Sequence, residues 1–162
     1  MMDDASRTDR ARSNEELARA LATFPDELER TLSGRPREDL VKPASDGGWG
    51  VVENLCHLRD WEEVFLGRIH QVLEEDQPRL PVYDDELWAI ERDYRGQDPH
   101  QALEQFRASR RKVVALLENL PDSAWNRTGH HESQGDVTVR WLAESILRHG
   151  ESHIAQIHDA LS

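Results

Sequence analysis

The stretch from Val139 to Leu161 reads VRWLAESILRHGESHIAQIHDAL, and its apolar residues decide the fold class. With about 100° of rotation per residue and His149 set at zero, they occupy one arc from about 20° to about 160°. The members of this arc are Leu142, Ile146, Leu147, Ile154, Ile157 and Leu161. The opposite side holds Glu144, Arg148, Glu151, Ser152 and Asp159. The pattern predicts a long amphipathic helix with one buried face.

Three earlier segments also carry the signals of long helices. Residues 13–32 begin with a Ser-x-x-Glu capping-box pattern and continue as an amphipathic helix, which Pro25 could kink or interrupt. A second helix is expected over residues 50–75, because an aspartate and two prolines follow it. A third is expected over residues 99–119, since it opens with Asp-Pro and a proline stops it.

The segments between these helices are rich in turn-forming residues. Residues 33–48 and 121–136 predict long loops, and residues 84–94 a short helix. No alternating run of useful length predicts a strand, and no internal repeat is present. The sequence therefore predicts an all-α protein, a four-helix bundle with long connections. We expect a single domain over 13–162 and a disordered N-terminus over 1–12.

Composition excludes several classes of protein. The chain has 162 residues, a formal net charge of -12 and a pI near 5.0, so its surface should repel nucleic-acid phosphates. No apolar run approaches the roughly 18 residues of a membrane span, and the polar N-terminus does not resemble a secretory signal. The single Cys56 excludes an internal disulfide. We therefore expect a cytoplasmic protein that binds neither nucleic acid nor membrane.

Two histidines of the last helix lie on one face. His153 is about 40° from His149 and one turn further on, at the edge of the apolar arc. Histidines at this spacing can hold one metal ion because both rings project over the same turn. Histidines are common in helices, so the pair alone does not distinguish a metal site from ordinary helical histidines. His158 lies near 180°, away from the other two, and is expected to be exposed.

A third histidine has a matching position on the second helix. With His57 at zero, Trp61, Phe65, Leu58 and Ile69 fall at about 40° to 120°, so His57 also lies at the edge of an apolar arc. The two helices could therefore direct three histidines towards one another inside the bundle. Cys56 is about 100° from His57 and should not share a metal ion; we interpret it as a small, partly buried residue.

Acidic residues of the second helix are weaker candidates. Glu62 falls near 140°, inside the apolar arc, where a buried carboxylate would need a partner. A hydrogen bond to a metal-ligating residue and an outward-directed surface position are both open for it. Asp60 and Glu53 are further candidates for acid–base or supporting roles. The remaining histidines are expected to be exposed, and they are His70, His100, His130 and His131.

Four segments together resemble the DinB/YfiT-like superfamily of small four-helix metal-binding proteins. They are GGWGVVENLCHLRDWE at 47–62, LENLPDSAW at 117–125, GDVTVRWL at 135–142 and HGESHIAQI at 149–157. Their order and spacing carry the resemblance over nearly the whole chain. It implies a divalent metal held by His57, His149 and His153, the residues that the helical wheels select.

The chain departs from the family pattern at two places. Gly50 stands where members often have a serine that caps the second helix, which should weaken the cap by a few tenths of a kcal/mol. The segment from His153 to Gln156 lacks the basic residue that follows the last ligand in many members. If that residue holds an anionic substrate elsewhere, the substrate of this protein differs.

The resemblance implies two enzymatic functions, and a non-enzymatic one stays open beside them. The first is activation of a low-molecular-weight thiol for transfer to an electrophilic small molecule, as in thiol-dependent transferases of the family. The second is hydrolysis by a metal-bound hydroxide, and the third is a non-catalytic metal-containing binding module. Trp88, Trp125 and Trp141 are compatible with a module but are more simply core or interface residues. The metal could be zinc, nickel, iron or manganese, and relatives suggest a homodimer.

Overall fold

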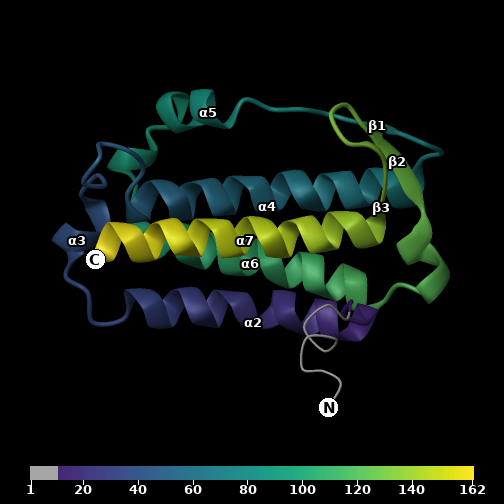
Figure 1. Ribbon diagram of the computed structural model, residues 1–162, viewed down its shortest axis with the longest axis horizontal. Coiled ribbons are helices and arrows are strands. Elements are labelled where there is room, and N and C mark those ends of the chain that lie inside the picture. The colour runs from purple at the N-terminus through teal and green to yellow at the C-terminus, as the bar shows by residue number, and fades with distance from the viewer. Residues whose placement is uncertain (1–10) are drawn as a thin grey trace, which may run out of the picture.

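The computed structural model describes residues 11–162, so the disorder expected for residues 1–12 falls almost entirely outside the described residues. Four long helices run side by side, and their bounds are α2 (Asn14–Leu32), α4 (Val51–Glu74), α6 (Pro99–Glu118) and α7 (Val139–Leu161). The predicted all-α four-helix bundle is confirmed (Figure 1). No helix in the described part of the chain has the length and apolar character that a bilayer span requires.

The helix starts follow the local signals. The Ser13 side chain accepts a hydrogen bond from the Glu16 amide (3.1 Å), and Asp98 accepts one from the amide of His100 (3.0 Å). Thr138 caps α7 in the same way by accepting from Trp141 (2.9 Å). Each of these caps satisfies an amide that would otherwise lack a partner in the first turn.

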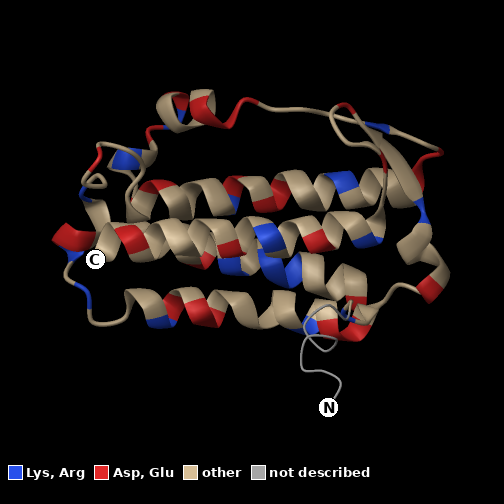
Figure 2. Cartoon of the chain, in the orientation of Figure 1, with Lys and Arg blue, Asp and Glu red and all other residues tan. Residues whose placement is uncertain are grey.

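The interior of the bundle contains two apolar clusters. α4 packs along α6 and α7, and α2 packs along the same two helices. One cluster gathers around residues such as Phe65, Ile69, Leu142 and Ile146, and the other around Leu28, Leu55, Phe106 and Ile157. Acidic and basic residues are spread along all four long helices (Figure 2). The buried arc predicted for α7 is thus the arc that packs into the bundle.

The connections contain more structure than their sequence suggests. A short helix, α3 (Arg37–Val41), lies in the first connection, and α5 (Asp85–Glu91) lies outside the four helices next to α4. Two 3-10 turns, η1 (Tyr94–Gly96) and η2 (Asp122–Asn126), complete the helical elements of residues 11–162. α2 continues through Pro25 without ending.

A small sheet forms where only loops were expected. Its strands are β1 (Arg79–Leu80), β2 (Thr128–His131) and β3 (Gly135–Thr138), with β1 parallel and β3 antiparallel to β2. Strands of two to four residues are too short to show alternation in the sequence. They pair because the end of α4 and the start of α7 bring these segments together at one end of the bundle (Figure 1).

Candidate metal centre

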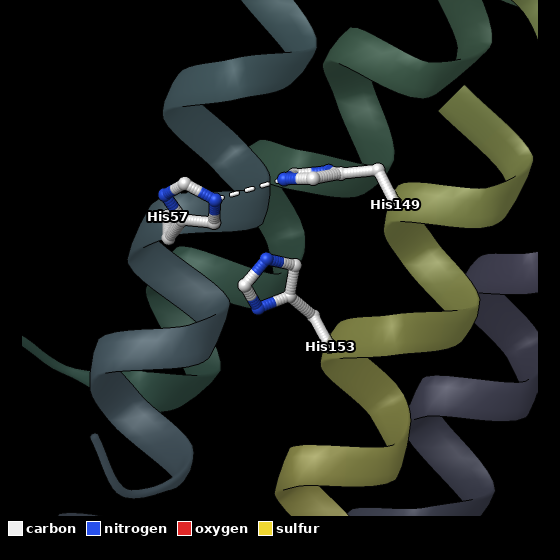
Figure 3. A group of neighbouring side chains, drawn as sticks. All are labelled: His57, His149 and His153. Carbon is white, nitrogen blue, oxygen red and sulfur yellow. Dashed lines mark hydrogen bonds between the residues drawn. The ribbon is translucent and has the colours of Figure 1, made fainter. Parts of the chain in front are cut away.

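Three histidines meet between α4 and α7. His57 projects from α4, and His149 and His153 project from adjacent turns of α7 (Figure 3). Each ring offers one nitrogen, and these three atoms all lie within 4.8 Å of one another. The structure therefore brings together the three residues that the sequence selected, although 92 residues separate His57 from His149.

Burial keeps these imidazoles neutral. His57 is 2% exposed and His153 is 9% exposed. Desolvation, followed by the neighbouring histidines, lowers the pKa of His57 to about 2. Desolvation, with smaller effects of His153 and Arg110, lowers the pKa of His149 to about 3. Burial also lowers the pKa of His153. Neutral imidazole is the form that binds a metal ion, so the environment favours the ligating state.

The donor set fits a small divalent cation. The Nε2 atoms of His57 and His149 face each other at 2.8 Å (Figure 3). The ring of His153 lies beside both, with ring centroids 4.4 Å from His57 and 4.5 Å from His149. Two nitrogens bound at about 2.05 Å to one tetrahedral ion would lie roughly 3.3 Å apart, so a shift of about half an ångström would admit it.

The outer nitrogens of two histidines face polar side chains. His153 Nδ1 lies 2.8 Å from Oδ1 of Asn54, which is fully buried in α4. His57 Nδ1 is buried without a hydrogen-bond partner among the described residues, and the nearest carboxylate oxygen belongs to Asp85, 4.0 Å away on α5. In metal sites of proteins, amide and carboxylate oxygens beside the outer nitrogen of a histidine orient the metal-binding imidazole.

Aromatic rings enclose the histidines. The ring centroid of Trp49 lies 5.0 Å from that of His57, and the centroid of Trp61 lies 5.9 Å from it. Phe65 contacts His149 edge-on at 5.7 Å. These rings displace water from the sides of the cluster that they cover, which strengthens electrostatic interactions there.

A cleft of about 1040 Å³ opens onto His153. Trp49 and Gln156 line it, together with the six acidic residues Asp46, Glu53, Asp85, Glu86, Asp93 and Asp159. Arg95 is the single Lys or Arg side chain in the described lining, and it pairs with Glu53 at 3.3 Å. The cleft is large enough for a small organic molecule and carries negative charge.

Comparison with known proteins gives the family. The family model of the DinB superfamily matches residues 20–157. The chain belongs to the DinB superfamily. Two relatives named "putative metal-dependent hydrolase" come from Oceanobacillus iheyensis and Geobacillus thermodenitrificans. The first is 24% and the second 27% identical, and each match covers 91% of this chain and 84% of the relative.

A solved structure has the same fold. YfiT from Bacillus subtilis superposes with a TM-score of 0.84 at 25% sequence identity, covering 93% of this chain and 89% of that one. It is described as a probable metal-dependent hydrolase with an unusual four-helix bundle topology. The DinB/YfiT-like resemblance of the sequence is thereby confirmed.

The acidic residues of α4 have structural partners in this DinB fold. Glu62 is 2% exposed and forms an ion pair with Arg110 of α6, so the outward position considered for it is wrong. Burial raises the pKa of Glu62, and Arg110 opposes that effect. Asp60 accepts hydrogen bonds from Tyr94 (2.5 Å) and Arg59 (2.9 Å).

The N-terminus of α4 explains both Glu53 and Gly50. The Glu53 carboxylate accepts a hydrogen bond from the Gly50 amide at 3.1 Å, which is the half of a capping box that needs no side chain at residue 50. A Cβ atom at Gly50 would lie 2.2 Å from the carbonyl oxygen of Lys42. This close approach leaves no room for a side chain at residue 50. Gly50 is therefore a steric requirement of the fold as well as a weaker helix cap.

The remaining predicted residues lie away from the cluster. Cys56 is fully buried and not partly exposed as predicted. Desolvation raises the pKa of its thiol to about 11, so the thiol is inert.

The histidines found exposed as predicted are His70, His100 and His158. His130 and His131 are half-buried in β2 and not exposed. Trp125 is a core residue, and Trp141 and Trp88 pack against the core.

The sequence analysis missed Asn54 and Asp85. Asn54 falls about 60° from His57 on the helical wheel, between Trp61 and Phe65, so a polar residue inside the apolar arc was the available signal. Asp85 carried no such signal, because a loop connects α5 to α4 and only the folded chain places it beside His57.

Proposed function

We propose that His57, His149 and His153 hold a divalent metal ion, and that the protein is a metal-dependent enzyme acting on a small molecule. The observation that carries the proposal is the convergence of three largely buried nitrogen donors beside an open cleft that His153 lines. Three imidazoles leave at least one position of the ion free, as in catalytic rather than structural sites. An ion bound there would lower the pKa of a water or thiol that reaches it.

The surroundings of the cluster favour chemistry that relies on the ion. Glu53, Asp60 and Glu62 all accept hydrogen bonds from amide or guanidinium groups in the structure. Carboxylates engaged in this way are poorly placed to exchange protons with a substrate. His57, His149 and His153 would therefore position the nucleophile, and the aromatic rings beside them would exclude bulk water.

We favour activation of a low-molecular-weight thiol for transfer to an electrophile. A thiol needs little help beyond deprotonation to become a strong nucleophile, which suits a site whose α4 carboxylates are already hydrogen-bonded. Hydrolysis of an ester or amide by an activated water is the second candidate, and the description of the relatives as metal-dependent hydrolases favours it. Zinc, nickel, iron and manganese all accept imidazole ligands, so the ion is to be identified by analysis of protein from its own host.

Metal content tests the site. We expect one ion per chain in the wild-type protein and loss of that ion in the His57→Ala and His153→Ala variants. His158→Ala is the matched control, because His158 lies on the same helix but is exposed and outside the cluster. Full metal retention in a His57→Ala/His153→Ala double variant would refute the proposed ligand set.

Activity assays separate the candidate functions. The metal-loaded protein is incubated with a small thiol and a generic alkylating electrophile, and separately with activated esters and amides. Thiol consumption above background supports transfer, whereas ester or amide cleavage without thiol supports hydrolysis. Absence of both reactions would favour a non-catalytic binding module. A cytoplasmic location and a homodimer remain predictions, to be tested by fractionation and sedimentation equilibrium.

A further inference from the structure

Asn54 connects the start of α4 with the metal cluster. Its side chain is fully buried, and its Nδ2 donates to the carbonyl oxygen of Gly50 at 2.9 Å and approaches that of Trp49 at 3.5 Å. Its Oδ1 lies 2.8 Å from Nδ1 of His153, across the interface between α4 and α7. The carboxamide therefore has one face on the α4 backbone and the other on the imidazole.

The direction of the hydrogen bond to His153 follows from this arrangement. Carbonyl oxygens only accept, so the NH₂ group of Asn54 must face Gly50 and Trp49. The reversed carboxamide would set its oxygen against those two oxygens. Oδ1 is thus the atom that faces His153, and because it only accepts, Nδ1 of His153 must carry the proton. A neutral imidazole has one N–H, so Nε2 is left with its lone pair.

We propose that Asn54 is a positioning residue that fixes the Nδ1–H tautomer and ring orientation of His153, so that Nε2 is available as a metal ligand. The inference rests on the proposed metal site. A buried imidazole without this acceptor would leave Nδ1–H unpaired, or would move its proton to Nε2 and lose the ligating lone pair. Asn54 contacts neither the ion nor the substrate and acts through His153 alone.

Two substitutions at Asn54 and one control test the role. Asn54→Leu removes the acceptor at similar volume, whereas Asn54→Asp keeps an acceptor for His153. In Asn54→Asp the second carboxylate oxygen faces the carbonyl of Gly50 and lowers stability, so its affinity is measured on the folded protein. That carbonyl keeps its bond from the main-chain amide of residue 54 at 3.2 Å. Asn119→Leu is the matched control, because Asn119 makes the same kind of side-chain bond to the carbonyl four residues earlier (2.7 Å, to Ala115). Asn119 lies at the end of α6 and outside the cluster.

Two readouts are measured on each protein. The ¹⁵N shifts of His153 in the metal-free protein report its tautomer, and competition with a chromophoric chelator reports Co²⁺ affinity. We expect Nδ1–H in the wild type and affinity about 10- to 100-fold lower in Asn54→Leu. Asn54→Asp should bind Co²⁺ within about threefold of the wild-type affinity, because it keeps an acceptor for His153. This loss is smaller than the one expected when a ligand-orienting group is removed. Asn119→Leu should match the wild type.

Three results would overturn the role of Asn54. They are an Nε2–H tautomer of His153 in the metal-free wild type, unchanged Co²⁺ affinity in Asn54→Leu, or equal losses in the Leu and Asp variants. If Asn54→Leu does not fold, the tautomer of His153 in the wild type and the Co²⁺ affinity of Asn54→Asp still test the role of Asn54. Failure of the wild type to bind Co²⁺ would refute the proposed metal site. The tautomer of His153 is measured without metal, so it tests the role of Asn54 independently of that result.

Discussion

Arg110 of α6 donates a hydrogen bond of 2.9 Å to the carbonyl oxygen of Leu21 on α2. This oxygen would normally accept from the amide four residues later, but that residue is Pro25, which has no N–H. The same guanidinium pairs with Glu62 of α4, so one side chain links three helices. Pro25 does not break α2, and the acceptor that it frees is used within the core.

We predict that removing one partner of the Arg110–Glu62 pair is costly. Arg110→Leu should lower the free energy of unfolding by about 3–5 kcal/mol, because it leaves a buried carboxylate without its counter-ion. The Arg110→Leu/Glu62→Leu double variant should recover much of that loss. Urea unfolding of the metal-free proteins measures both effects. A double variant that is less stable than either single variant would contradict the explanation.

Gly150, between His149 and His153, should resist replacement. Alanine normally stabilises a helix interior by about 1 kcal/mol relative to glycine. A Cβ atom at Gly150 would lie 2.9 Å from the Phe24 ring of α2, so Gly150→Ala should instead destabilise the protein by about 1–3 kcal/mol. Gly67→Ala is the control, since nothing lies within 4 Å of its added Cβ, and it should stabilise α4. Equal effects of the two substitutions in thermal unfolding would show that the contact with Phe24 is unimportant.

Acid should destabilise the metal-free protein through the histidine cluster. The pKa is lowered from 6.5 to about 2 for His57 and to about 3 for His149, so the unfolded chain takes up protons that the folded protein does not. Stability is therefore complete above about pH 6.5 and falls as the pH decreases below it. Between about pH 7 and 5.5 each histidine should contribute a loss of about 1 kcal/mol.

Urea unfolding at the two pH values measures this loss. A His57→Gln/His149→Gln variant serves as the control, and it should show a smaller change over the same interval. If the wild-type protein kept its full stability at the lower pH, the neutral, buried state assigned to these histidines would be wrong.

The charge of the cleft should select among thiols. Its lining contains six acidic residues and one arginine, which is already paired. We predict that cysteamine, which carries an ammonium group, binds the Co²⁺-loaded protein about tenfold more tightly than 3-mercaptopropionate, a difference of about 1.4 kcal/mol. The Co²⁺–thiolate absorption band measures both affinities.

Two controls test the origin of that preference. Added salt should reduce it, because exposed charges are screened. A Glu86→Gln/Asp159→Asn variant should reduce it as well, since both residues line the cleft and have no ion-pair partner among the described residues. Tighter binding of 3-mercaptopropionate, or an equal affinity for both thiols, would contradict the expected selection of cationic molecules.

Local patterns were sufficient for the helices and for the face on which each histidine lies. The rotation of about 100° per residue predicted that His149 and His153 share a face of the helix and that His158 lies outside the metal-binding group. The same argument placed His57 at the edge of the buried arc of α4. These relationships depend only on the geometry of a single helix, which the order of residues determines.

The contacts between helices could not be read in this way. The partner of Glu62 is Arg110, 48 residues later in the chain, and nothing in the local pattern of either residue identifies the other. The two- to four-residue strands form because helix ends hold them together, and their own sequences have no strand signal. Tertiary packing decided both features.

The sequence by itself determined four amphipathic helices, the caps of α2 and α6, and which histidines point towards a core. Only the tertiary structure decided that His57 lies 2.8 Å from His149, that Asn54 accepts from His153, and that Gly50 must lack a side chain beside Lys42. The physical reason is that hydrogen bonding within a helix fixes directions residue by residue. Distances between helices, by contrast, are set by how all the buried side chains pack at once.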